Sequence, residues 1–204
     1  NNVVINGSNA TPSVYSTAGT TMGIAGDLTI TAGHLRMATG ASSGTLNVNG
    51  TLTMNGGSLV LTNSGTVTDV GTLNLFGNLV MSSGNIGRTS SVANGFINFA
   101  HPTATQTWTY SGGSFSILSG FGIPVNVGTG SSTNTLSLAS NVTASSITVN
   151  VLSGSTLNFG TNTFASGGSM SFVAANGSTL ITANAGGFAS TGATGSVQST
   201  GGRT

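Results

Sequence analysis

The residues able to do acid–base chemistry are few, and the two carboxylates come first. Asp27 and Asp69 are the only acidic side chains in the chain. Glycoside hydrolysis needs two carboxyl groups on opposite sides of the scissile bond. The repeat described below places Asp27 and Asp69 on different runs, about two coils apart, so we expect them to face different directions. A carbohydrate-active β-helix enzyme therefore remains only a second alternative, and we expect no catalytic residues.

Histidine and cysteine chemistry gives no stronger signal. His34 lies among apolar residues in a Gly-His-Leu-Arg-Met run, and His101 precedes Pro102. We expect His34 to face solvent and His101 to lie in a corner, with neither beside a nucleophile. The chain has no cysteine, and two histidines with two aspartates at these spacings do not form a metal-ligand pattern. We expect no cofactor and no metal.

The composition excludes several partners. Only 2% of the residues are charged and the net charge is +1, whereas ordinary soluble domains carry roughly 25% charged residues. Phosphate backbones are bound by many Lys and Arg side chains, so nucleic acid is excluded as a partner. No apolar run approaches the ~20 residues of a membrane-spanning helix, so we expect no membrane insertion.

Short alternating runs punctuated by glycine indicate β-structure. There are 33 glycines and only 3 prolines, and apolar residues alternate with Thr, Ser and Asn in runs of about five residues. Such alternation is typical of half-buried strands. It also argues against disorder, which the polar composition alone would allow.

An internal repeat predicts the architecture. Residues 44–64 align with 65–84 at a spacing of about 21 residues, and residues 26–37 match 50–61 without a gap. In the second copy, Gly-x-apolar-x-apolar runs occupy 44–48, 50–54 and 57–61. These spacings are too short for a crossover helix between parallel strands of a flat sheet. The sequence therefore predicts an all-β parallel β-helix, or β-solenoid, with about three short strands per coil.

Strand alternation then predicts the core. The inward candidates are the apolar residues of each run: Leu28, Ile30, Leu35, Met37, Leu46, Val48, Leu52, Met54, Leu59, Leu61, Leu73, Leu75, Leu79 and Met81. Asp69 breaks the alternation at the position where Val48 stands one repeat earlier. Because a lone buried carboxylate is costly, we expect a bulge there that turns Val70 inward.

We expect one solenoid segment over residues 1–204: regular coils at about 20–84, less regular aromatic-rich coils at 85–130, and regular coils again at 131–204. Trp108 and Tyr110 share one face of a strand in the aromatic-rich part. The favoured interpretation is that both fill the core. The alternative is an exposed aromatic contact for a sugar or a protein partner.

Outward threonines suggest a second function class. The 21-residue alignment stacks Asp27, Thr51 and Thr72 beside Thr29, Thr53 and Asn74. Flat threonine arrays on β-solenoids resemble ice-binding surfaces, so Thr29, Thr51, Thr53 and Thr72 are a candidate surface ladder. Threonine is also simply favoured on exposed strands, so ice binding stays an alternative.

The two ends of the solenoid are expected to need partners. Capping coils protect their edges with charges, proline or a covering helix. The stretch 196–204 has one charge and no amphipathic helix, and the stretch 1–6 resembles an open strand. We expect further coils of the same chain, or neighbouring subunits, to cover them. The chain is thus interpreted as a fragment of a longer protein.

Two stretches resemble a known family. Residues 155–188, STLNFGTNTFASGGSMSFVAANGSTLITANAGGF, lead into a motif with Gly192, Ala193, Thr194, Gly195, Gln198, Thr200, Gly201, Arg203 and Thr204. This resembles the Thr/Gly-rich β-helical modules of very large Bacteroidetes cell-surface proteins. The resemblance implies type IX secretion, an extracellular surface location and an adhesin-like, non-catalytic structural role. It also implies contact with the secretion machinery and with surface glycans or other cells.

Overall fold

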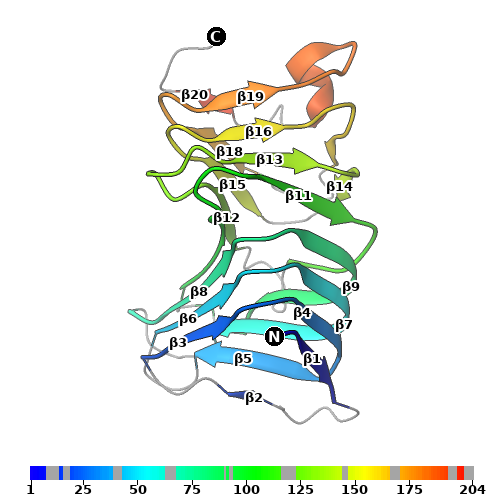
Figure 1. The fold of residues 1–204 in the computed structure, drawn as a ribbon. Helices are drawn as coiled ribbons and strands as arrows, with labels where there is room; N and C mark the ends of the chain where they lie inside the picture. The colour runs from blue at the N-terminus through cyan, green and yellow to red at the C-terminus, as the bar shows by residue number, and fades with distance from the viewer. Residues whose placement is uncertain are drawn as a thin grey trace.

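The chain forms a β-solenoid in a computed structural model, with coils stacked from the N-terminus to the C-terminus (Figure 1). The structure describes residues 1–7, 14–15, 19–38, 43–62, 68–89, 91, 94–115, 123–143, 147–165, 171–192 and 197–199. Nearly all regular structure among them is β-strand, and the exception is one short 3-10 helix, η1, at Gly187–Thr191.

Most strands belong to two long parallel sheets, which we call sheet 1 and sheet 2. Sheet 1 contains β1 (Val3–Asn6), β4 (Leu28–Ala32), β7 (Leu52–Thr62), β9 (Leu79–Arg88), β11 (Thr105–Tyr110), β13 (Thr135–Leu138), β16 (Thr156–Asn158) and β19 (Thr179–Ile181), in that order. At its N-terminal end β5 (His34–Ala38) pairs with the second half of β7, and β2 (Val14–Tyr15) pairs with β5.

Sheet 2 has one strand from each coil. Its members are β3 (Thr21–Ile24), β6 (Gly44–Val48), β8 (Val70–Leu75), β10 (Asn94–Phe99), β12 (Pro124–Val127), β15 (Thr148–Val151), β18 (Ser171–Ala174) and β20 (Val197–Ser199). A short third pair joins β14 (Val142–Thr143) to β17 (Phe164–Ala165).

The predicted parallel solenoid is confirmed, but the register read from residues 44–84 is wrong. Leu46 pairs with Leu73, and Leu52 pairs with Leu79, so each of these partners lies 27 residues along the chain rather than 21. The match of 26–37 with 50–61 is correct, because Leu28 pairs with Leu52. Coil length varies along the solenoid, from 21 residues between Thr135 and Thr156 to 30 between Trp108 and Leu138.

The second and third predicted runs form one bent strand in β7 and again in β9. A column of glycines lies at this bend, with φ of 77° at Gly33, 59° at Gly57, 82° at Gly84 and 102° at Gly113. Residues with a Cβ rarely adopt these left-handed angles. Glycine therefore lets the chain turn at the same place in four successive coils.

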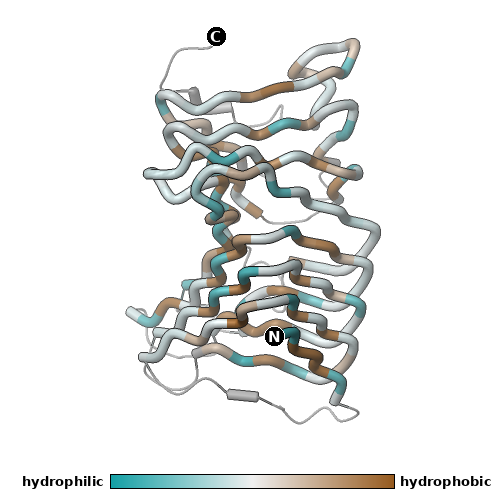
Figure 2. The backbone as a smooth tube through the Cα atoms, viewed as in Figure 1, coloured by the Kyte–Doolittle hydropathy of each residue, from teal (hydrophilic) through white to brown (hydrophobic). Residues whose placement is uncertain are grey.

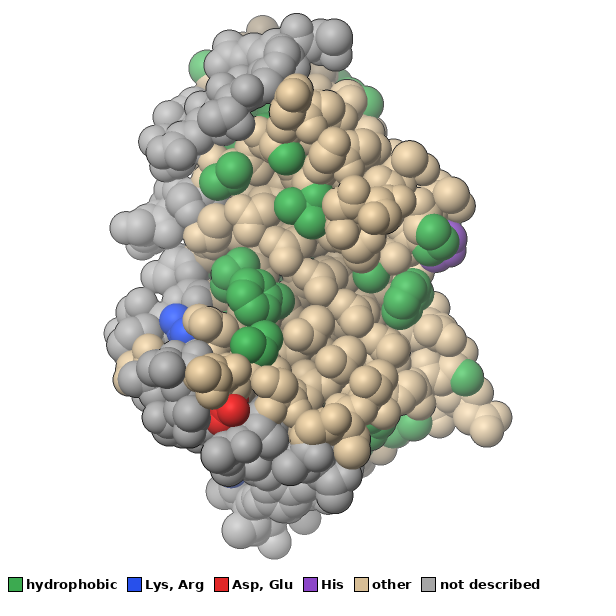
Figure 3. All heavy atoms as spheres, turned by 90° about the vertical axis from the view of Figure 1, so that its left-hand side faces the viewer, with side chains coloured by type: hydrophobic (Ala, Val, Ile, Leu, Met, Phe, Trp, Pro, Cys, Tyr) green, Lys and Arg blue, Asp and Glu red, His purple; other side chains and the backbone are tan. Residues whose placement is uncertain are grey.

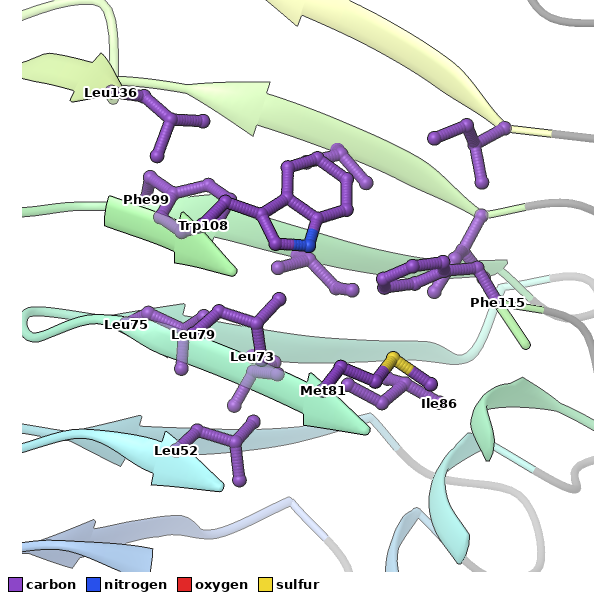
Figure 4. Packing of buried hydrophobic residues seen from close by; sticks show 14 of the residues in the cluster. Leu52, Leu73, Leu75, Leu79, Met81, Ile86, Phe99, Trp108, Phe115 and Leu136 are labelled. Atoms are coloured by element: carbon purple, nitrogen blue, oxygen red, sulfur yellow. The ribbon is translucent and has the colours of Figure 1, made fainter. Parts of the chain in front are cut away.

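The core lies between the sheets and is continuous along the solenoid. All 14 predicted inward residues are buried, none more than 1% exposed. Figure 2 shows hydrophobic and hydrophilic residues alternating along the N-terminal strands. In Figure 4, Leu73 and Leu75 of sheet 2 and Leu79 and Met81 of sheet 1 lie in the same interior. Period-2 alternation therefore predicts which side chains are inside.

The expectation for Asp69 is wrong. The Asp69 side chain is buried, at 6% exposed, and Val70 on the next position is half-exposed on the outside of β8. Asp69 has an interacting partner in the structure, and its backbone oxygen accepts a hydrogen bond from the Asn94 amide at 3.0 Å. The penalty that we expected for an isolated carboxylate therefore does not apply.

The short helix η1 packs against the core near its C-terminal end. Phe188 of η1 makes edge-to-face contacts with Phe159 at 5.4 Å and with Phe172 at 6.2 Å between ring centroids. The side chain is partly buried against the core.

Candidate functional site

The two carboxylates lie at opposite ends of a sheet 2 strand. Asp27 is exposed in the corner before β4, and Asp69 precedes β8. Asp69 lies in a corner before a sheet 2 strand, and Asp27 lies in a corner after one. A sheet 2 strand such as the 6-residue β8 separates these corners, which places them about 20 Å apart at roughly 3.3 Å per residue. A glycosidase pair is separated by roughly 5–9.5 Å. Asp27 and Asp69 are thus not such a pair, and Asp27 Oδ1 instead accepts a hydrogen bond from the Thr51 amide at 2.8 Å.

His101 stabilises a turn, and His34 lies within a strand. His101 Nδ1 accepts hydrogen bonds from the amides of Thr103 at 3.3 Å and Ala104 at 2.8 Å, and thereby closes the turn before β11. His34 is half-buried on β5, so it does not point freely to solvent as expected. Among the described residues no group of three or more His, Cys, Asp or Glu side chains is placed to hold a metal ion.

The candidate threonine ladder is divided between the two sheets. Thr29 and Thr53 are neighbours on the outside of sheet 1, and Thr51 lies in the preceding corner above Asp27. Thr72 is on sheet 2, where it pairs with Thr45. The 21-residue alignment had joined Thr72 to the wrong sheet, so these four residues do not form one surface.

Trp108 fills the core, as the favoured interpretation predicts. It is 0% exposed and contacts Phe99, Phe115 and Phe164 with ring centroids 5.2 to 5.9 Å apart. Figure 4 shows its indole ring above Leu79 and between the sheets. Tyr110 is partly buried, and its hydroxyl donates a hydrogen bond to the Gly113 carbonyl oxygen at 2.7 Å. Trp108 is therefore not available to stack on a ligand.

The outer surface of sheet 2 carries a feature that we did not predict. Five asparagines, one per coil, form a column that we call the Asn ladder: Asn47, Asn74, Asn98, Asn126 and Asn150. After Asn47, each Asn donates from its Nδ2 to the Oδ1 of the Asn in the preceding coil, at 2.7 to 2.9 Å. All five side chains are half-exposed. The sequence signal was present as a recurring apolar-Asn-apolar tripeptide, such as Leu-Asn-Val at 46–48.

Beside the Asn ladder runs a second column, two residues earlier on each strand. Thr21, Thr45 and Thr72 are followed by Phe96, and Thr148 pairs with Pro124. The register of Ile97 with Val125 places Pro124 next to Phe96. Figure 3 shows the left-hand side of Figure 1 as largely uncharged, with hydrophobic side chains gathered near its middle. This column is therefore polar at its ends and apolar at its centre.

A buried polar network lies inside the corner between the sheets. Gln106 Nε2 donates to the carbonyl oxygens of Leu75 at 2.9 Å and Gly77 at 2.6 Å. Gln106 Oε1 accepts from Asn134 Nδ2 at 3.2 Å, and Asn134 Oδ1 accepts from the Ser132 hydroxyl at 3.1 Å. Buried polar groups satisfied in this way fix one packing arrangement. The network therefore satisfies the buried polar groups of Gln106, Ser132 and Asn134 without a ligand.

Comparison of the chain with protein-family models, curated proteins and solved structures finds no match. No helix within the described ranges is long and apolar enough to cross a membrane. Of the C-terminal motif that carries the family resemblance, only Gly192 and Gln198 are among the described residues. The outer surface of sheet 2 is thus the candidate functional site on the strength of its own geometry.

Proposed function

We propose that this chain is a non-catalytic structural and adhesive module of a large secreted bacterial cell-surface or filament protein. The observation that carries the proposal is the Asn ladder. Its side chains bond from coil to coil along the solenoid, so polar groups on the surface hold the stack together while still facing outward. This arrangement suits a stiff element that displays a uniform surface.

The open strand edges support a place within a longer assembly. In the described sheets β1 is the edge strand of sheet 1 at the N-terminal end, and its Val4 is 64% exposed. Such edges readily pair with another strand. We propose that further coils or a neighbouring subunit pair with this end. Extracellular location, type IX secretion and contact with glycans or other cells belong to the same proposal, and they rest on the resemblance of residues 155–204.

Adhesion is tested with beads coated with the purified protein and washed over a bacterial biofilm and over bare glass. Beads carrying the wild-type chain should be retained on the biofilm, and beads carrying the unfolding variant Leu52→Asp should wash off. Equal retention of both would show that the folded surface does not adhere, and would refute the adhesive half of the proposal.

The non-catalytic half has its own test, which uses the two carboxylates. Incubation with a panel of polysaccharides should release no reducing ends, and Asp27→Asn and Asp69→Asn should behave as wild type. Release of reducing ends that either substitution abolishes would establish a carbohydrate-active enzyme instead.

Ice binding is the second candidate, and one specific observation favours it. Thr105, Thr135, Thr156 and Thr179 lie in one column on the outside of sheet 1, in consecutive coils. Repeated hydroxyls at the coil spacing of about 4.8 Å form a regular array. Ice-crystal shaping and thermal hysteresis test this candidate: both should be lost in Thr135→Lys/Thr156→Lys if it is correct, and absence of both in the wild type would exclude it.

A further inference from the structure

The centre of sheet 2 presents an aromatic ring on its outside. Phe96 lies between Gly95 and Ile97, both buried, so its own side chain points outward, where it is half-exposed. Its neighbours in the column are Thr72 on one side and Pro124 on the other. Elsewhere in the described part of the solenoid the large aromatic contacts lie in the interior, so the outward ring of Phe96 contributes nothing to the core.

The Asn ladder adjoins this ring, since Asn98 lies two residues after Phe96 on the same strand and the same face. A side-chain amide has two N–H donors and two acceptor lone pairs. In the ladder Asn98 uses one donor toward Asn74 and one lone pair toward Asn126. One donor and one lone pair remain at each interior Asn, held in a fixed orientation by the ladder bonds.

Few charges lie near this face: Arg88 Nη1 donates to Asn94 Oδ1 at the start of β10 at 3.5 Å, and Figure 3 shows one acidic and one basic side chain beside the hydrophobic group. None of the described strands of sheet 2 contains Asp, Glu, Lys or Arg. A charged ligand would find no opposite charge on these strands to compensate for its lost hydration, whereas a neutral ligand rich in hydroxyl groups meets amides, hydroxyls and a ring. Charge therefore selects among the candidate ligands.

We propose that the outer face of sheet 2 binds an extended neutral polysaccharide along the solenoid axis. One sugar ring stacks its C–H face on Phe96 and Pro124, and the hydroxyl groups of neighbouring sugars bond to the Asn ladder. Successive ladder amides are about 4.8 Å apart, and an extended glycan advances by a similar distance per sugar. This inference rests on the proposed adhesive function and names the ligand class and the face involved.

Binding to the insoluble polysaccharides cellulose, chitin and mannan is measured as depletion of the purified protein from the supernatant. Binding to soluble xyloglucan is measured by titration calorimetry. Phe96→Ser removes the ring from an outward position, so the core is untouched. Truncation of a central aromatic anchor should weaken binding about tenfold or more. Asn98→Thr should weaken it too, because the ladder loses its middle amide. The matched control is Val80→Ser, which removes a half-exposed apolar side chain from the outside of sheet 1, away from the edge strand β1.

The expected result is binding to at least one neutral polysaccharide, loss of that binding in Phe96→Ser and Asn98→Thr, and no change in Val80→Ser. Near-UV circular dichroism should be unchanged in all three variants. Binding that Phe96→Ser retains would overturn the assignment to sheet 2. Equal or stronger binding to alginate, an acidic polysaccharide, would overturn the neutral ligand class. Failure to bind any of the glycans would refute the inference, yet bead retention on the biofilm would then still support adhesion through a protein partner.

Discussion

The Asn ladder makes a quantitative prediction, because its members have unequal numbers of bonds. Asn98 both donates to Asn74 and accepts from Asn126, whereas Asn47 at the start of the ladder only accepts, from Asn74. Replacement by alanine removes two ladder bonds at Asn98 and one at Asn47. Both positions lie outward on sheet 2 strands, so the change in strand propensity is common to both.

The magnitude follows from the bond count. A hydrogen bond contributes about 0.5–1.5 kcal/mol net to stability. Asn98→Ala should therefore lower the free energy of unfolding by about 1–3 kcal/mol, and Asn47→Ala by about half as much. Chains of hydrogen bonds also polarise one another. The double variant Asn98→Ala/Asn126→Ala should consequently lose less than the sum of its single variants, since the bond between these two residues is counted twice in that sum.

Urea unfolding followed by the fluorescence of Trp108 measures these differences. Trp108 is the only tryptophan and is buried in the core, so its emission reports loss of packing in the coils that the ladder crosses. Equal destabilisation by Asn98→Ala and Asn47→Ala would refute the bond-count reasoning. Additive losses in the double variant would show that the two amides do not interact.

Three further predictions concern packing, turns and titration. Leu52→Asp buries a carboxylate between two coils and should lower the free energy of unfolding by several kcal/mol or more, which circular dichroism would show as loss of the β-sheet signal. The control Thr53→Asp, on the outside of the same strand, should change stability by less than about 1 kcal/mol. Gly71→Ala brings a methyl group against the backbone carbonyl of Leu61 at the end of β7 and should cost about 1–3 kcal/mol in thermal denaturation. Gly23→Ala has open space and should be neutral to slightly stabilising. Burial raises the pKa of Tyr110 above its usual 10.0, so the stability that this group provides is complete below pH 10 and is lost as the pH rises through its folded-state pKa. Tyr110→Phe should therefore move the alkaline unfolding midpoint upward, and an unchanged midpoint would show that this phenol does not titrate with unfolding.

The core could be predicted from the sequence, whereas the coil register could not. Alternation places Leu52 and Leu73 inside, and both are buried. Because both sheets use the same apolar-x-apolar pattern, however, a shift by one strand preserves the pattern. The alignment therefore matched Leu52 of sheet 1 to Leu73 of sheet 2, and the true partner of Leu52 is Leu79.

The Asn ladder on sheet 2 could not be predicted from the sequence for a different reason. Asparagine is depleted in strands and common in turns, so the outward residues Asn74 and Asn98 did not stand out as a feature. Their stabilising partners lie 24 to 28 residues away, and only the folded coil reveals them. Asp69 likewise could not be placed, because its own run does not show that the Asn94 amide, 25 residues later, bonds to its backbone oxygen and that its side chain is buried.

Because coil lengths differ, the number of residues between two positions does not determine their distance along the solenoid axis. Paired residues lie 21 to 30 positions apart in sequence, yet each coil advances the stack by the same spacing of about 4.8 Å. Insertions and deletions between strands therefore leave the axial geometry unchanged. Chemical labels attached at equivalent outward positions of consecutive coils would be evenly spaced, whatever the length of the connecting segments. The solenoid can therefore serve as a scaffold that sets regular distances between attached groups.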